Sequence, residues 1–198
     1  MQHKTLLPAF AAPGDDAQHV FRLALTALSE PGSVHDVGDL PGLAGLAPAT
    51  YALCLTLFDS DTPIWLAPSL NTAQIRENLA FHCACPVTRE RKQAAFALVT
   101  ESDLADLSAF QQGTDRDPHL SCTVIVQLDS LESGRSTTWQ GPGIADRRHA
   151  RLPVPASFWA LRTSVGFPRG LDFFFTAGRQ LTGLPRSTRV LRTVQEIN

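Results

Sequence analysis

The sequence predicts an α/β protein in which a mixed central β-sheet is flanked by helices. Segments with the apolar spacing of a helix alternate with short apolar or β-branched segments, and neither repeats nor low-complexity linkers interrupt them. Residues 171–175 (Leu-Asp-Phe-Phe-Phe) are apolar at four of five positions, which is typical of a central strand covered on both faces. A hairpin expected at Gly134 argues against a purely parallel sheet.

Five segments are expected to be helical, and most follow a residue that suits a helix N-terminus. The first should end at Pro31-Gly32, and the apolar content of the second also permits a strand. The segments, with their capping or first-turn residues in parentheses, are residues 17–29 (Asp15 or Asp16), 49–58 (Pro48), 73–82 (Asn71 or Thr72), 103–111 (Ser102) and 156–163.

Strands are expected where short apolar or β-branched runs are bounded by turn residues. Residues 171–175 should lead through a turn to a final segment, 184–190. A Gly/Pro-rich loop is expected at 38–48, and residues 146–151 form a polar stretch between elements. The other expected strands are residues 33–37, 63–67, 94–100 and 120–128, with a hairpin of 129–132 and 136–140 around Gly134.

Composition fits one globular domain, residues 1–198. The chain has 198 residues, 43% of them hydrophobic, a formal net charge of −2 and a pI of about 6.3. Without a basic field, nucleic acid and anionic membranes are not expected as partners. The N-terminal apolar patch is too short for a signal peptide and no stretch is long enough to span a membrane, so a cytoplasmic protein is expected.

Cysteine and arginine usage adds two expectations. Cys54 and Cys122 lie inside apolar runs, which favours reduced, buried thiols. The chain has 15 Arg against two Lys, Lys4 and Lys92. Arginine suits bidentate contacts with carboxylates and phosphates, although a GC-rich coding bias gives the same count.

One acidic motif resembles a known nucleophile. Asp59-Ser60-Asp61-Thr62 is similar to the motif of haloacid dehalogenase-type phosphatases, where one carboxylate attacks phosphorus and the next acts as acid and base. That nucleophile should follow a buried strand, whereas Pro48 predicts a helix here. We therefore favour a turn stabilised by its own side chains, with a phosphatase using Asp59 and Asp61 as the alternative function.

Two further motifs have ordinary structural explanations. His82-Cys83-Ala84-Cys85 offers metal-ligand types, but structural zinc needs a second pair at matching spacing, so no metal site is expected. Gly141-Pro142-Gly143 lacks the third glycine of a dinucleotide fingerprint. It is interpreted as a tight turn, with a backbone nest for an anion as the alternative. Spacing alone predicts no catalytic residue.

Asp172 is the anomaly in the apolar segment 171–175. A carboxylate in a buried strand needs a partner, and Arg179, Arg186 and Arg189 are the nearest candidates in the sequence. Arg186 with Ser187 and Thr188 could instead hold an anion through a guanidinium fork and two hydroxyls. Both a structural Asp172–Arg186 ion pair and a phosphate contact by Arg186 remain open from the sequence.

Several blocks together resemble the PhnH family, the H subunits of bacterial carbon-phosphorus lyase systems. They occur in order over about residues 16–190, each is weak, and jointly they are specific. The family pattern does not include Cys83 and Cys85. The blocks are Asp16-Ala17-Gln18-His19-x-Phe21-Arg22, Ala27-Leu28-Ser29-Glu30-Pro31-Gly32, Leu55-Thr56-Leu57-x-Asp59-x-Asp61-Thr62-Pro63-x-Trp65-Leu66, Phe81-His82, Gly141-Pro142-Gly143-Ile144, Phe167-Pro168-x-Gly170-x-Asp172 and Leu184-Pro185-Arg186-x-Thr188.

The resemblance implies a fold like the large domain of pyridoxal-phosphate-dependent transferases, a homodimer, and a complex with subunits G, I and J. That complex degrades alkylphosphonates, and its early step joins a phosphonate to the ribose of ATP with loss of adenine, giving ribose 1-phosphonate 5-triphosphate. The resemblance implies no catalytic residue set for H. The candidates for an anion, substrate or interface role are Arg22, His82, Gly141, Gly143, Asp172, Arg186 and Thr188.

The sequence agrees with the absence of pyridoxal phosphate. That cofactor needs a Schiff-base lysine, and Lys4 and Lys92 both lie outside the expected central strands. No cofactor is therefore expected. The leading hypothesis is a non-catalytic or substrate-assisting subunit; a pyridoxal enzyme using Lys92 and a small-molecule sensor are further alternatives.

The homodimer has one expectation of its own. Trp65, Trp139 and Trp159, with the loop at 38–48, suggest exposed apolar surface, because aromatic residues commonly anchor interfaces. Each tryptophan could equally belong to the core.

Overall fold

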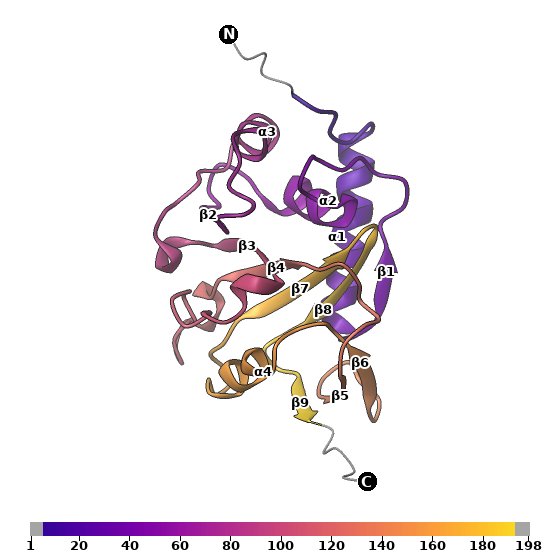
Figure 1. The fold of residues 1–198 in the computed structure, drawn as a ribbon, viewed down its shortest axis with the longest axis vertical. Coiled ribbons are helices and arrows are strands. Elements are labelled where there is room, and N and C mark those ends of the chain that lie inside the picture. Colours follow the sequence, from indigo (N-terminus) through magenta and orange to yellow (C-terminus); the bar gives the residue numbers. More distant parts are fainter. Residues whose placement is uncertain (1–5, 193–198) are drawn as a thin grey trace.

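The computed structural model of the chain describes residues 6–192 and contains two sheets (Figure 1). The larger has six strands in the order β1-β8-β7-β4-β3-β2, and the smaller has three in the order β6-β5-β9. The helices are α1 (Pro13–Ser29), α2 (Pro48–Leu57), α3 (Ala73–Cys83) and α4 (Ala156–Thr163). The strands are β1 (Val34–Asp36), β2 (Ile64–Leu66), β3 (Phe96–Thr100), β4 (Thr123–Gln127), β5 (Ser136–Gln140), β6 (Arg148–Arg151), β7 (Asp172–Ala177), β8 (Gln180–Leu184) and β9 (Arg189–Arg192).

The six-stranded sheet is mixed, as the sequence predicted. Strands β2, β3, β4 and β7 run parallel to one another, and β8 pairs antiparallel with both β7 and β1. The antiparallel pairs come from the tight connection between β7 and β8, not from the hairpin expected at Gly134. Strands β1 and β2 form the two edges of the sheet, and β7 lies in its interior between β4 and β8.

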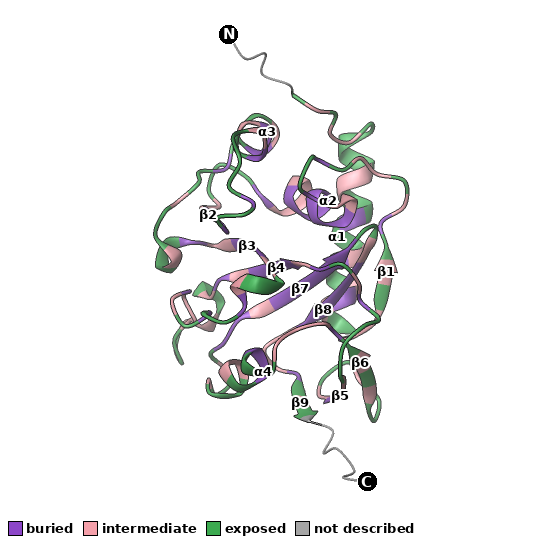
Figure 2. Ribbon diagram, in the orientation of Figure 1, coloured by how far each residue is buried: buried purple, intermediate pink, exposed green. Residues whose placement is uncertain are grey.

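Strand β7 contributes to a hydrophobic core on each face of the sheet, which explains its unbroken apolar run. Phe174 packs into the core formed with α1, α2 and α3. Phe173 and Phe175 pack into the opposite core, together with Phe158 of α4 and the small sheet. All three phenylalanines are buried, and burial of each contributes about 1.5–3 kcal/mol (Figure 2). The strand is therefore sandwiched between two layers, which requires apolar residues at successive positions.

Four of the five expected helices are confirmed, including the segment at 49–58 for which a strand was also open. Thr72 caps α3 as expected, since its side-chain oxygen accepts a hydrogen bond from Ile75 N at 3.2 Å. The expected cap of α1 was wrong: the helix already begins at Pro13, behind Ala12. The Asp16 carboxylate instead accepts a hydrogen bond from the amide of Ala12 at 2.9 Å, inside the first turn.

The fifth expected helix, 103–111, was wrong. Only a single 3₁₀ turn, Glu101–Asp103, forms there, and Thr100 rather than Ser102 caps it through reciprocal bonds with Asp103. The residues that follow are irregular: Leu104, Leu107 and Phe110 are buried in the core, and Asp106 O accepts a hydrogen bond from Arg91 Nη1 at 3.1 Å and not from a helix amide. Tertiary packing thus overrides the local helical pattern.

The hairpin expected around Gly134 was also wrong. β5 pairs with β6 and with β9, both antiparallel, and residues 129–132 form no strand. Part of the polar stretch 146–151 supplies the partner strand β6. Its burial alternates between intermediate and exposed, so no apolar run marked it in the sequence.

All three tryptophans belong to the core, so the expectation that they form exposed surface was wrong. Their exposed fractions are 9% for Trp65, 0% for Trp139 and 7% for Trp159. The Trp139 and Trp159 rings meet edge to face at 6.4 Å, which fixes the small sheet to α4. No helix among residues 6–192 is long and apolar enough to cross a bilayer.

Candidate functional site

Asp172 and Arg186 form the most closely bonded charged pair of the described chain. Asp172 begins β7, beside Thr123 at the start of β4, and Arg186 follows β8. The Arg186 guanidinium approaches both carboxylate oxygens: Nη2 is 2.5 Å from Oδ2, and Nε is 3.1 Å from each oxygen. The backbone amide of Arg186 also donates to Oδ1 at 2.7 Å. The predicted structural ion pair is therefore present.

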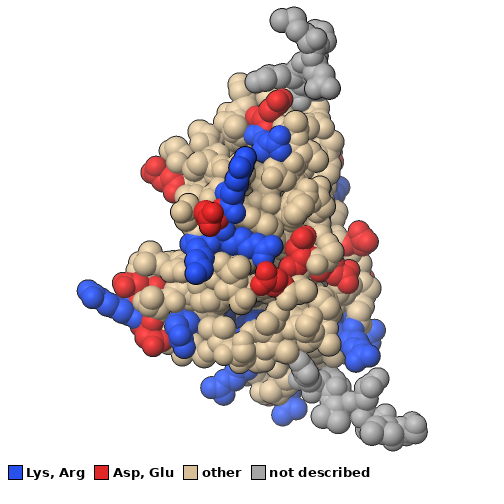
Figure 3. All heavy atoms as spheres, turned by 60° about the vertical axis from the view of Figure 1, so that its left-hand side comes forward, with Lys and Arg blue, Asp and Glu red and all other residues tan. Residues whose placement is uncertain are grey.

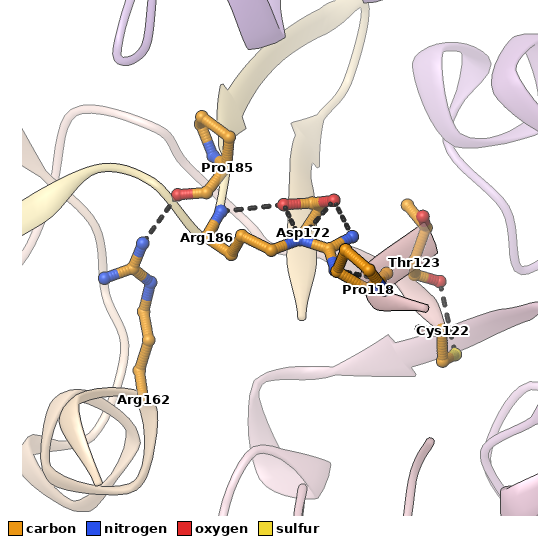
Figure 4. Close-up of polar contacts among 7 residues, drawn as sticks. All are labelled: Pro118, Cys122, Thr123, Arg162, Asp172, Pro185 and Arg186. Carbon is orange, nitrogen blue, oxygen red and sulfur yellow. Dashed lines mark hydrogen bonds and ion pairs between the residues drawn. The ribbon is translucent and has the colours of Figure 1, made fainter. Parts of the chain in front are cut away.

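The same guanidinium has a third partner. Its Nη1 donates to the carbonyl of Pro118 (Figure 4). The two side chains are only 16% and 20% exposed. In this arrangement each of the three guanidinium nitrogens already has an acceptor, and the charge of Arg186 neutralises Asp172.

A cavity of about 60 Å³ lies beside this pair, near the beginning of β7. Three arginines contribute to its wall: Arg162 of α4, Arg169 of the loop before β7, and Arg186. Polar side chains from Ser108, Gln112 and Ser164 also line it. A cavity lined by three arginines therefore lies beside the N-terminal end of β7.

Arg162 is the least compensated of these arginines. Its Nη2 donates to the carbonyl of Pro185 at 2.6 Å, whereas its buried Nε has no hydrogen-bond partner among the described residues. Figure 4 shows Arg162 reaching the carbonyl of Pro185, while the side chain of the next residue, Arg186, extends to Asp172. Burial lowers the pKa of Arg162 to about 10, and the nearby Asp172 only partly opposes this. The guanidinium stays charged at neutral pH, but at a desolvation cost.

Thr188 and Gly141 lie in the same neighbourhood as Arg186. Thr188 is 1% exposed, its amide donates to the carbonyl of Pro185 at 3.0 Å, and its hydroxyl has no partner among the described residues. A Cβ added to Gly141 would lie 3.1 Å from Ser187 O and 3.3 Å from Thr188 Cα. The glycine thus allows the end of β5 to approach the turn that precedes β9.

Gly143 has a packing role at the end of α1. Gly141-Pro142-Gly143 forms a turn, closed by a bond from Ile144 N to Gly141 O at 3.1 Å, as the favoured interpretation predicted. Gly143 has a φ of 79°, and a Cβ there would lie 1.7 Å from the carbonyl oxygen of Ser29. Any side chain would collide with α1, so glycine is required for close packing.

Two of the seven candidates lie on separate elements. Arg22, on the exposed side of α1, donates to Gln18 at 2.5 Å. His82, near the end of α3, bonds through Nε2 to the carbonyl of Leu7 at 3.0 Å. The structure therefore brings together Asp172, Arg186, Thr188 and Gly141, and places Arg22, His82 and Gly143 in other local contacts.

The acidic motif at 59–62 is a turn, as favoured from the sequence. It follows helix α2, not a buried strand. Asp59 Oδ1 accepts from Asp61 N at 2.9 Å, while Thr62 Oγ1 accepts from Asp59 N at 2.7 Å and donates to Asp59 O at 2.9 Å. The carboxylate and hydroxyl thus stabilise the turn. The buried strand that should precede a phosphatase nucleophile is replaced by a helix here.

The cysteines are buried and unpaired by disulfides. Cys54, Cys83, Cys85 and Cys122 are all free thiols. Cys83 Sγ lies 3.6 Å from Cys54 O and Cys85 Sγ lies 3.9 Å from Leu79 O. Burial raises the pKa of Cys122 to about 12 and also raises that of Cys54. Residues 6–192 contain no cluster of three His, Cys, Asp or Glu side chains that could hold a metal ion.

Lys92, the alternative Schiff-base candidate, lies on an exposed 3₁₀ turn before β3, and Lys4 lies outside the described residues. Sequence reasoning missed Arg162 and Arg169 as site residues. The high arginine content was the one available signal, and it did not distinguish these two from the other thirteen.

Acidic and basic side chains are interspersed over the face shown in Figure 3, in keeping with the small net charge. The fold and the site together define an α/β protein with three arginines beside a cavity, two of them paired with the carboxylates of Asp172 and Asp115. The chain belongs to the PhnH family of bacterial phosphonate metabolism proteins, whose family model matches residues 8–191.

Two relatives support this assignment. The chain is 34% identical over 190 residues to a protein of Rhizobium meliloti (strain 1021) named alpha-D-ribose 1-methylphosphonate 5-triphosphate synthase subunit PhnH, covering 93% of this chain and 94% of the relative. It is 25% identical over 181 residues to a Stutzerimonas stutzeri protein named putative C-P lyase subunit protein HtxG, covering 87% and 85%.

Proposed function

We propose that this chain is a subunit of a bacterial carbon-phosphorus lyase complex and acts in phosphonate degradation through ribose 1-phosphonate 5-triphosphate. The observation that carries the proposal is the 34% identity, over nearly the full length of both chains, to the synthase subunit of Rhizobium meliloti. The second relative, named as a putative C-P lyase subunit, points the same way. The chain supports assembly and lends charged residues to a phosphate-rich substrate, without being catalytic alone.

The candidate residues for substrate or interface contacts are the seven named from the sequence. Asp172, Arg186, Thr188 and Gly141 are the strongest of them, because they lie close to one another and Arg186 lines the cavity. Arg22, His82 and Gly143 are retained as interface candidates on other elements. Because the charges and hydrogen-bonding groups of Asp172 and Arg186 are paired with each other, we propose that these two residues position the neighbouring groups of the site.

We further propose that residues 1–198 form one PhnH-like domain related to the large domain of pyridoxal-phosphate-dependent transferases. The family match over residues 8–191 supports a single domain over most of the chain, and the parallel arrangement of β2, β3, β4 and β7 supports the relationship. The reaction catalysed by the complex is proposed to belong to subunits other than this one.

The proposed partners are a second copy of this chain and subunits G, I and J, in the cytoplasm. The buried tryptophans no longer support a homodimer. Phe21 and Leu25 on α1 do, because they are 46% and 53% exposed and offer apolar surface to a partner. Light scattering at micromolar concentration tests this part, and a monomer would contradict it.

Coexpression with subunits G, I and J, followed by size-exclusion chromatography, tests the complex. We expect this chain to elute with the other subunits at a mass above that of any one of them. A strain without this chain should lose growth on methylphosphonate as the phosphorus source and keep growth on inorganic phosphate. Separate elution together with unchanged growth on methylphosphonate would contradict the proposed function.

A further inference from the structure

We propose that the cavity between α4 and the beginning of β7 binds one tetrahedral oxyanion, a phosphate or phosphonate group, through Arg162 and Arg169. This inference rests on the proposed function only in its choice of phosphonate among oxyanions. The binding site itself follows from the charges, the hydrogen-bond donors and the volume of the cavity.

The first argument is the charge balance around the cavity. Three guanidinium groups, from Arg162, Arg169 and Arg186, line the cavity, and two of them are paired with carboxylates outside its lining. Asp172 is bonded by Arg186, and Asp115 is paired with Arg169 at 3.3 Å. One positive charge is thus left without a carboxylate of its own, and a bound anion would compensate it.

The second argument is which donors are available. Arg186 has acceptors for all three of its nitrogens, in Asp172 and Pro118, so it is not the binding group. Arg162, by contrast, has a buried Nε without a partner among the described residues. The Arg162 guanidinium is therefore incompletely hydrogen-bonded, and an anion in the cavity that it lines would offer it a charged acceptor.

Arg169 lines the cavity and is exposed enough to exchange its ion-pair partner. Its side chain is 50% exposed, and its carboxylate partner Asp115 is 78% exposed, so the pair is screened by water and easily exchanged. Arg169 can therefore leave Asp115 for a ligand in the cavity at little cost. Two guanidinium groups would then hold the ligand from different sides, with Ser108, Ser164 and Gln112 as neutral neighbours.

The third argument is size. A cavity of about 60 Å³ holds a few water molecules, which corresponds to one phosphate-sized group and not to a whole nucleotide. A larger ligand would place one terminal group inside and extend through the entrance beside Arg169. Free phosphate or alkylphosphonate and the terminal phosphate of a nucleotide are thus two sources of the same group.

The test is isothermal titration calorimetry of the full chain with inorganic phosphate, methylphosphonate and ATP, in buffer of constant ionic strength set with sodium chloride. We expect saturable binding of phosphate to the wild type. Arg169→Gln and Arg162→Met should each weaken it by tenfold or more. If ATP competes for the site and binds at least tenfold more tightly than phosphate, the terminal phosphate of a nucleotide is the ligand; if not, the free ion is.

Arg179→Gln is the matched control. Arg179 is also 50% exposed and also paired with one exposed carboxylate, Asp36, at 3.2 Å, but it lies next to β1 and not at the cavity. This variant should bind phosphate like the wild type. Because Arg169 is half exposed, Arg169→Gln should fold even if Arg162→Met does not.

Two results would overturn the inference: no binding of phosphate or methylphosphonate by the wild type, or undiminished binding by Arg169→Gln. Loss equal in Arg169→Gln and Arg179→Gln would also overturn it, since general attraction by surface charge would then explain the binding. Coelution with subunits G, I and J reports on the proposed function separately, so failure of anion binding and failure of assembly are distinguishable.

Discussion

Both oxygens of the Asp172 carboxylate are bonded by Arg186, through its guanidinium and, at 2.7 Å, through its own backbone amide. The two residues are 14 positions apart, and strands β7 and β8 between them bring them together. This pair fixes the segment after β8 to the beginning of β7. It thereby places Pro185, which accepts from Arg162, beside the cavity.

Removal of Arg186 should destabilise the protein strongly. Arg186→Ala leaves the largely buried Asp172 carboxylate without its cation, and we expect a loss of about 3 kcal/mol in the free energy of unfolding, at the lower end for a buried pair. Urea denaturation measures it. Arg179→Ala is the control: its pair with Asp36 is half exposed, so the loss should be much smaller. Equal losses in the two variants would show that the burial of the Asp172 pair has no energetic consequence.

Gly143→Ala should lower the stability of the folded protein strongly. The added Cβ would meet Ser29 O at 1.7 Å, at a φ of 79°, so we expect a loss of about 3 kcal/mol or more from strain and overpacking. Gly38→Ala is the control, because Gly38 has a similar φ of 84° and no atom within 4 Å of an added Cβ. That variant should lose only about 1 kcal/mol. A thermal melt of Gly143→Ala that matches Gly38→Ala would refute the close contact with α1.

The stability of the protein should fall as the pH rises above 9, partly because of Cys122. Burial raises the pKa of this thiol to about 12 in the folded protein, against about 9 for a free thiol. The unfolded chain therefore loses the proton first, which favours unfolding between pH 9 and 12. From pH 9 to pH 10 this contributes a loss of about 1 kcal/mol.

The variant Cys122→Ala tests the assignment by urea denaturation under reducing conditions. Its loss of stability from pH 9 to pH 10 should be smaller than that of the wild type by about 1 kcal/mol. Val124→Ala, which removes buried bulk from the adjoining strand β4 without removing a thiol, should be less stable at both pH values and should lose as much stability as the wild type between them. If Cys122→Ala loses as much stability between pH 9 and pH 10 as the wild type does, the thiol does not cause the decline.

Asp59 should be dispensable for phosphonate use. The Asn in Asp59→Asn keeps an oxygen that can accept from Asp61 N, so the turn should lose at most about 1 kcal/mol. A strain carrying this variant in place of the wild type should grow on methylphosphonate at the same rate. Phosphatase turnover by the purified chain that disappears in Asp59→Asn would instead support the phosphatase function.

Much of the fold was predictable because local chemistry determined it. Thr72 caps α3, Pro48 begins α2, and the three consecutive phenylalanines of β7 require cover on both faces of the sheet. The partner of Asp172 was predictable as well, since a buried carboxylate needs a cation and Arg186 was among the nearest three. The helix starts depend on neighbouring residues in the chain. The strand and the ion pair follow from the need to cover buried apolar residues and to neutralise a buried charge.

Other features depended on contacts between distant segments. Strand β6 has no apolar run and exists because β5 offers it hydrogen-bond partners. The segment after Asp103 forms no helix, and Arg91, 15 residues away, bonds the carbonyl of Asp106. The three tryptophans are buried in the core that the two sheets and α4 form together. Such contacts depend on the arrangement of the sheet, which no window of sequence contains.

The sequence by itself determined the alternation of helices and strands, the central position of β7 and the membership of the PhnH family, because apolar spacing, capping residues and short motifs are local properties. The tertiary structure alone decided which arginines share a cavity. Arg162 reaches it from α4, Arg169 from the loop before β7 and Arg186 from the segment after β8. Their charges act together only because the chain is folded, since electrostatic attraction depends on distance and burial in space and not on separation along the sequence.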